Sequence, residues 1–261
     1  VWTYDETTKD WYSFEIEELC KQTGDFTATK LVDGSPKVFA ISSFDTELIF
    51  GDCISIVPNN FLYKCANFNS KITLTNVDTI QGAFMWGCTN FDKDIDLTNI
   101  RSIGEAFMYL CEKFNRPLDM ENVTTIYKDF LGQCCSFNSQ ITMPKVEKIG
   151  NSFLVDCKNF GSSATDPMTI TFPSTLTQVA DYCMTGCDGF VGTIQLNCSV
   201  DCIATSQPYS FASYSSSAKI YTNGFKVTGD SDKVEEFKKS FPFSDGDPIL
   251  LAHGIYRKYA Q

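Results

Sequence analysis

Cysteine is the residue type whose number and spacing most suggest chemistry. The 261 residues include 12 cysteines, and the pairs Cys183-x3-Cys187 and Cys198-x3-Cys202 follow one another closely. Four thiolates can hold Zn²⁺, but these pairs lack the short spacing of a zinc knuckle. Cys183 and Cys187 also occupy positions that are apolar in other parts of the chain. We therefore expect no metal here, and a disulfide within 198–202 or to a neighbouring cysteine stays open.

Acidic residues offer a second candidate, a calcium loop. Asp92-x-Asp94-x-Asp96 has the spacing of the first three ligands of an EF-hand. That loop also needs Gly at its sixth position and Glu at its twelfth, where this chain has Leu97 and Ile103. The acids are better explained as surface side chains along a strand, so we expect no metal and no cofactor.

Catalysis has little support in the sequence. His253 is the single histidine and lies in the C-terminal tail, and the chain has neither Gly-x-Ser-x-Gly nor a Gly-rich phosphate loop. A pair of carboxylates could form a hydrolase site, but the acids are abundant and scattered. We therefore expect that the protein is not an enzyme, and a carboxylate-dependent hydrolase is the least favoured alternative.

Net charge and hydropathy limit the classes of partner that the protein could bind. The chain carries 21 Lys and Arg against 32 Asp and Glu, a net charge of −11. Binding to nucleic acid needs a basic face, and no apolar run approaches the ~20 residues of a membrane span. We expect neither nucleic-acid binding nor membrane insertion.

The spacing of the cysteines also reveals a sequence repeat, and this repeat determines where every candidate residue lies. A disulfide network has no reason to keep a fixed stride, whereas a repeat has. Five cysteines lie 23 residues apart, and Cys187 extends their column: Cys65, Cys88, Cys111, Cys134 and Cys157. We predict a buried ladder of small thiols.

The repeat frame is apolar almost throughout. Six units give eight columns of six residues, and only Gly51 in these columns is not apolar. The strides are 23 residues, except for a last stride of 29 that absorbs an insertion around 164–168. The units start at Ile49, Ile72, Ile95, Leu118, Ile141 and Ile170.

Units of this length cannot bury eight apolar side chains alone, so they must stack. The alternation in Ile72-Thr73-Leu74 predicts a short strand, and strands of successive coils would pair in parallel about 4.8 Å apart. Between 103 and 111, apolar residues recur at intervals of four, one and three, which predicts a short helical turn. Asn and Asp after the closing Phe suit a tight turn into the next strand.

The block from Ile170 to Cys187 resembles the repeat of BspA-like leucine-rich-repeat proteins. Met143-Pro144, Ile149-Gly150, Ala106-Phe107 and Gly87-Cys88 match its pieces, although Phe replaces the usual Leu in the closing column. The resemblance implies a capped repeat solenoid with a parallel β-sheet on one face and short helical turns on the other. It also implies a binding or adhesion role at bacterial or protist surfaces, and it explains the cysteine ladder without oxidation.

Three regions are expected. Residues 1–48 form an N-terminal cap or a separate anchoring module, 49–193 form the six-repeat solenoid, and 194–261 form a degenerate C-terminal cap and tail. In the first region, 1–4 and 11–14 flank a polar stretch and suggest a hairpin, followed by a short helix or strand over 14–21. In the last, 219–221 resemble a final strand, and Asp230-Ser-Asp232 could cap a helix with Val234, Phe237 and Phe241 on one face.

The predicted binding face is the outward column of the strands, flanked by Lys71, Asp94, Gln140 and Thr169. Solenoids commonly use such an extended face for ligands. We expect a protein or glycan partner and an extracellular or cell-surface location. The column consists of Thr73, Asp96, Asp119, Thr142 and Thr171.

A virion component, such as a phage head-decoration protein, fibre or tail adhesin, is the alternative. Other virion proteins would then be its partners. No leader is visible in 1–10 and the thiols are expected to be free, which fits cytosolic assembly. Asn122 and Asn197 begin sequons, but Asn76 and Asn99 share the column of Asn122, so a structural role is the better interpretation of Asn122.

Overall fold

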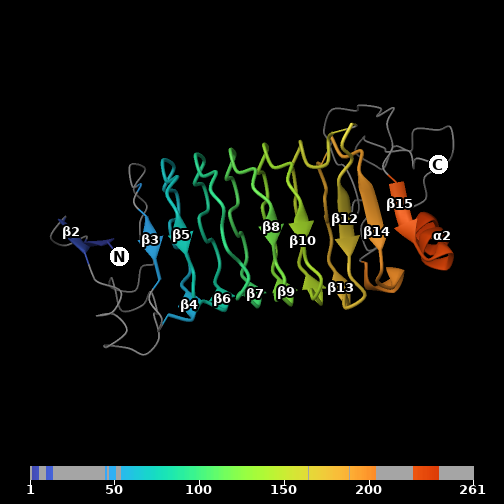
Figure 1. Cartoon of the computed structure of the whole chain (residues 1–261), viewed down its shortest axis with the longest axis horizontal. Helices are drawn as coiled ribbons and strands as arrows, with labels where there is room; N and C mark the ends of the chain where they lie inside the picture. Colours follow the sequence, from blue (N-terminus) through green and yellow to red (C-terminus); the bar gives the residue numbers. More distant parts are fainter. Residues whose placement is uncertain are drawn as a thin grey trace.

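The computed structural model describes residues 2–5, 10–13, 45, 47–50, 54–163, 165–187, 189–203 and 226–240. Within these ranges the chain winds into stacked coils whose axis is the long axis of the molecule (Figure 1). Most coils contribute one short strand to each of two parallel stacks. The predicted repeat solenoid is confirmed, with parallel pairing throughout the stacks.

The first stack runs along the middle of Figure 1. Its strands pair in parallel within three short sheets, and a bridge from Ile72 to Ile95 extends the first of them. Pairing continues beyond residue 193, where the apolar repeat of the sequence decays. The strands are β3 (Leu48–Ile49), β5 (Ile72–Thr73), β8 (Leu118–Asp119), β10 (Ile141–Thr142), β12 (Thr169–Phe172), β14 (Thr193–Leu196) and β15 (Lys226–Gly229).

The second stack is a six-stranded parallel sheet, which the sequence reasoning did not anticipate. Its outward residues alternate with a buried Val or Ile in every coil, so two residues per coil are enough to pair. The strands are β4 (Ile56–Val57), β6 (Thr79–Ile80), β7 (Ser102–Ile103), β9 (Thr125–Ile126), β11 (Lys148–Ile149) and β13 (Gln178–Val179).

The segment after the second strand forms a run of turns in place of the expected helical turn. In one coil, Ala83, Met85 and Gly87 all have positive φ, of 56°, 56° and 75°. Because the sign of φ alternates along this segment, its N–H groups point in turn toward the next coil and the preceding coil. Ala83 N–H donates to Glu105 O in the next coil (2.7 Å), and Met85 N–H donates to Phe61 O in the preceding one (2.7 Å). A helix would direct these groups along its own axis and leave the neighbouring coils unbonded.

The core consists of the predicted apolar columns, with one correction in the first coil. Ile49 is 59% exposed, whereas Leu48 and Phe50 are buried and take the positions predicted for Ile49 and Gly51. Leu48 lies in register with Ile72, so this coil is one residue longer than the others. The polar exception in the columns therefore disappears, because Phe50 fills that place; Gly51 itself lies outside the described residues.

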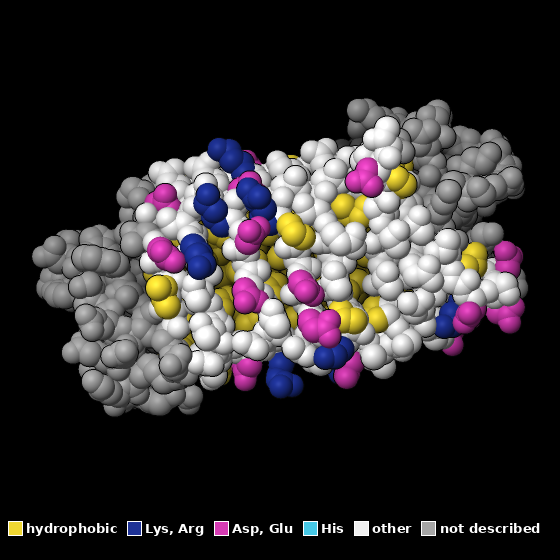
Figure 2. Space-filling model, viewed as in Figure 1, with side chains coloured by type: hydrophobic (Ala, Val, Ile, Leu, Met, Phe, Trp, Pro, Cys, Tyr) yellow, Lys and Arg dark blue, Asp and Glu magenta, His cyan; other side chains and the backbone are white. Residues whose placement is uncertain are grey.

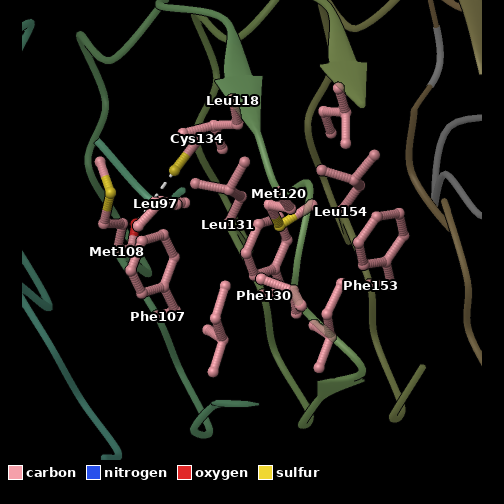
Figure 3. Close-up of a cluster of buried hydrophobic side chains, with 14 of the residues drawn as sticks. Leu97, Phe107, Met108, Leu118, Met120, Phe130, Leu131, Cys134, Phe153 and Leu154 are labelled. Carbon is pink, nitrogen blue, oxygen red and sulfur yellow. Dashed lines mark hydrogen bonds between the residues drawn. The ribbon is translucent and has the colours of Figure 1, made fainter. Parts of the chain in front are cut away.

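Two ladders of phenylalanine rings run through the core. Phe107 stacks between Phe84 and Phe130, with ring centroids 5.4 and 5.3 Å away. Figure 3 shows Phe107, Phe130 and Phe153 side by side from successive coils. The closing column forms the second ladder, in which Phe114 and Phe137 stack at 5.8 Å. Each coil therefore depends on both neighbours for the burial of its rings.

The ends of the chain match the expectations in part. The predicted hairpin is present as β1 (Trp2–Asp5) paired antiparallel with β2 (Asp10–Ser13). The predicted C-terminal helix is present as α2 (Ser231–Ser240), where Val234 N–H donates to Asp230 O, and η2 (Val200–Cys202) precedes it. The expectations for 14–21, 219–221, Phe241 and 243–261 lie outside the described residues.

Candidate functional site

The five predicted binding residues occupy one outward column of the first stack. Asp119 is the register partner of Thr142, and Thr73 and Thr171 hold the same place in β5 and β12. The residues that alternate with them, such as Leu118 and Met120, are buried. We call this column the polar stripe, with the members Thr73, Asp96, Asp119, Thr142 and Thr171.

The register extends the polar stripe at both ends. Ile49 pairs with Thr73, and Gln195 pairs with Thr171. The sequence reasoning missed Ile49 because of its one-residue error in the first coil. Gln195 could have been found from the alternation Thr193-Ile194-Gln195-Leu196.

The stripe residues differ in how firmly they are held. The Asp96 carboxylate accepts hydrogen bonds from Thr98 N–H (2.9 Å) and Thr98 Oγ1–H (2.6 Å). These two bonds hold the pKa of Asp96 below its usual value, so it stays ionised near neutral pH. Asp119 is exposed, and its carboxylate accepts no hydrogen bond from the described part of the chain. Asp119 is therefore the acid of the stripe that is free to meet a partner.

The residues that flank the stripe are partly structural. Gln140 Nε2 donates to the carbonyl oxygens of Ile141 (3.0 Å) and Thr169 (2.9 Å), which ties β10 to β12. Lys71 and Asp94 are exposed. Figure 2 shows Lys and Arg side chains gathered over the N-terminal coils, with acidic side chains among them. This face of the molecule therefore carries charges of both signs.

Of the three acids considered for calcium, Asp92 bonds to neighbouring coils. Asp92 pairs with Arg116 at 3.1 Å. Its Oδ1 also accepts a hydrogen bond from Asn115 N–H, while Asp92 N–H donates to Asn69 Oδ1. Side chains in the turn after the closing Phe therefore accept hydrogen bonds from the backbone of the next coil, and this contact repeats from coil to coil. No group of three His, Cys, Asp or Glu that could hold a metal occurs in the described ranges.

The cysteines of the ladder are buried and form no disulfide with the described part of the chain. Each thiol of the ladder from Cys88 to Cys187 donates to a carbonyl oxygen of the preceding coil, as Cys134 Sγ–H does to Met108 O at 3.1 Å (Figure 3). Burial raises the pKa of Cys134 above its usual value. A protonated, hydrogen-bonded thiol is a poor nucleophile, so this column is structural. The sequence did not indicate the donor role.

The second cysteine group is also free. Cys198 and Cys202, for which a disulfide stayed open, are both thiols in this structure. A hydrogen bond from the Cys202 side chain lowers the pKa of Cys198, and the nearby Lys233 ammonium acts in the same direction. Cys183 and Cys187 are buried in the core. Within the described ranges, neither belongs to a group of residues that could hold a metal.

The predicted structural role of Asn122 is supported by its contacts. Its Nδ2 donates to Thr98 O in the preceding coil at 2.8 Å, just as Asn99 Nδ2 donates to Thr75 O at 2.7 Å. An attached glycan would use this nitrogen and remove one of its two hydrogens. Asn197 is exposed, and its Oδ1 accepts a hydrogen bond from Gln195 Nε2.

Stacked coils of fixed length, parallel strands and internal ladders define a solenoid of the leucine-rich-repeat class. The model of the BspA type leucine-rich repeat region matches residues 35–161 and 162–231, with six copies, and the chain belongs to this family. A search of curated proteins and a search of solved structures returned no match.

Membership indicates a repeat protein of a kind that often serves in binding. BspA-type repeat proteins are often surface-associated, and leucine-rich repeats generally mediate protein interactions. Their fold is typically a non-catalytic scaffold for binding. Among the helices that the structure describes, none has the length and apolar character that a membrane span needs.

Proposed function

We propose that this protein is a non-enzymatic binding protein that contacts a protein or glycan partner at a cell surface through the polar stripe. The observation that carries the proposal is the separation of roles along the strands. In β8, Leu118 is buried in the core while Asp119 is exposed, and β10 repeats this arrangement with Ile141 and Thr142. The outward side chains can therefore be selected for a partner without cost to the core.

The size and charge of the stripe support this role. Five residues on adjacent coils, at ~4.8 Å per strand, span ~19 Å along the axis. Asp96 and Asp119 hold equivalent positions in successive coils, and like charges repel one another. A partner with cationic or hydrogen-bond donor groups would relieve this repulsion, which favours binding at the stripe.

The test is a double charge reversal, Asp96→Lys with Asp119→Lys, after a partner has been found by pull-down from cell-surface extracts or on a glycan array. Charge mismatch at an interface costs several kcal/mol, so binding should fall by at least about tenfold. Surface changes stay within about 0.5 kcal/mol of neutral for stability, so the melting temperature should hold.

A matched control makes the same change in net charge elsewhere. Glu112 and Glu147 are exposed and lie outside the first stack, so Glu112→Lys with Glu147→Lys should bind as the wild type does. Undiminished binding by the stripe variant would refute the proposal. Equal losses in both double variants would show that net charge, not the stripe, controls binding.

A further inference from the structure

One tyrosine stands alone on the outer side of the second stack. Tyr127 follows β9 directly and is 54% exposed. The register pairs Ile126 with Ile103 and with Ile149, so the next residues along the column are Gly104, Tyr127 and Gly150. The two adjacent coils therefore carry no side chain at the position equivalent to Tyr127.

The two glycines are required by the packing of the coils. A Cβ on Gly104 would lie 2.5 Å from the backbone carbon of Gln81, and a Cβ on Gly150 would lie 2.6 Å from Lys128 N. Real Cβ atoms do not approach backbone so closely. The close approach of the coils thus excludes a side chain at either position, and at Gly150 the excluded Cβ would face the backbone of Tyr127 and Lys128.

A hollow of about 500 Å³ opens beside this ring, a volume within the usual range of small-ligand sites. We call it the Tyr127 hollow. Apart from Tyr127 and Ile126, Ile149 and Gly150, its lining is polar. The polar residues that line it are Glu105, Thr125, Lys128, Lys148, Asn151 and Gln178.

Most of these polar groups are unused within the protein. Lys128 Nζ pairs with Glu105 Oε2 at 3.1 Å. The side chains of Lys148, Asn151 and Gln178 are exposed, and they form no hydrogen bond with the described part of the chain. The hollow therefore offers an exposed aromatic ring beside amide groups that donate and accept hydrogen bonds and an ammonium group that donates them.

We propose that the Tyr127 hollow binds one pyranose ring of a glycan. The C–H face of the sugar would lie on the Tyr127 ring, and Asn151, Gln178 and Lys148 would bond its hydroxyl groups. A sugar presents one apolar face and a rim of hydroxyls, which is the complement of this lining. The inference assumes that the protein is a binding protein, but the site is separate from the polar stripe.

Other ligand classes fit this lining less well. A peptide strand cannot add here, because both edges of β9 are already paired, with β7 and β11. An apolar side chain would leave the two amides without partners, at the cost of their lost hydration. A phosphate would meet the Glu105 carboxylate beside Lys128. The saccharide is the class that uses all the groups present.

The experiment is saturation-transfer difference NMR on the full chain. The probes are the methyl glycosides of glucose, galactose, mannose and N-acetylglucosamine. We expect the wild type to saturate at least one of them. Tyr127→Ala should weaken that binding by at least about tenfold, because an aromatic contact is lost. Tyr127→Phe should bind within about twofold of the wild type, because the ring face remains.

Two controls separate this inference from other causes. Tyr182→Ala removes another exposed tyrosine, 36% accessible and outside the hollow, and should bind the sugar normally. The melting temperature of Tyr127→Ala should stay close to that of the wild type, because the ring is exposed.

Three results would overturn the proposal. The first is a wild type that saturates none of the four glycosides. The second is full saturation in Tyr127→Ala. The third is a sugar signal that is lost in Asp96→Lys with Asp119→Lys and kept in Tyr127→Ala, which would place the glycan on the polar stripe and leave the proposed function intact.

Discussion

The buried thiols should make this solenoid unusually sensitive to alkaline pH. Burial raises the pKa of Cys88, Cys111, Cys134, Cys157 and Cys183 well above the ordinary thiol value. In the unfolded chain the same groups ionise near pH 8.5. The folded state therefore keeps protons that the unfolded state releases, so the free energy of unfolding is unaffected below about pH 8 and falls as the pH rises above about 8.5.

The size of the effect follows from the number of thiols. Each group that is ionised only in the unfolded state lowers the free energy of unfolding by about 1.4 kcal/mol per pH unit. Five such thiols give about 7 kcal/mol per unit once they are fully ionised. A domain of ordinary stability, about 5–15 kcal/mol, would unfold within about one to two units above pH 9.

The assay is urea unfolding followed by circular dichroism at pH 7, 8.5, 9.5 and 10.5, with a phosphine reductant to prevent oxidation. Cys134→Ala should reduce the alkaline slope by about 1.4 kcal/mol per pH unit. Cys135→Ala, at an exposed neighbour, should leave the slope unchanged. A slope below about 2 kcal/mol per pH unit, well under the value from five thiols, would show that the ladder ionises in the folded protein and that its burial is wrong.

Two further predictions concern the core and the thiols. Phe107→Ala should lower the free energy of unfolding by about 3–5 kcal/mol, because it empties the space between Phe84 and Phe130; a thermal melt unchanged within about a degree would contradict the stacking. With a thiol reagent and peptide mapping on the native protein, Cys135 should be labelled rapidly and Cys134 only after denaturant is added, because one thiol is exposed and the other is buried; equal labelling rates would contradict the buried ladder.

Much of the fold could be predicted because the core is periodic. Columns of Ile, Phe and Cys at a fixed stride specify stacking without any knowledge of the backbone. The error at Ile49 arose because a stride imposed from later coils hides a single extra residue. The alternation Leu48-Ile49-Phe50 fits either register, and only pairing with Ile72 decides between them.

The turns could not be predicted from apolar spacing. Intervals of four, one and three suit a helix, but they also suit a run of residues that alternates between the two signs of φ. Hydrogen bonding to both neighbouring coils selects the second form, at positions such as Met108 with φ of 52°. The sequence alone does not show that the backbone of this segment must bond to both neighbouring coils.

The Tyr127 hollow was not predicted because it is an exception within its column. The sequence shows Tyr127 between Gly104 and Gly150 in the repeat, but it does not show that this position is exposed beside a hollow. Its significance depends on Gly104 and Gly150 standing beside it in the register, and on the polar side chains of the next coils. Sites of this kind require a structure.

Because successive coils bond to one another at equivalent positions, the repeat array could lengthen by one whole coil at a time. Every coil donates to and accepts from both neighbours at equivalent positions, so duplication of a 23-residue segment would add a layer about 4.8 Å thick without disturbing its neighbours. The longer insertion before β12 projects from the stack, and residues 165–167 within it are exposed. Because the Tyr127 hollow is lined by residues of four successive coils, a duplicated block of four coils would carry a complete copy of it. The length of the array and the number of its ligand sites could thus change together during the history of the gene.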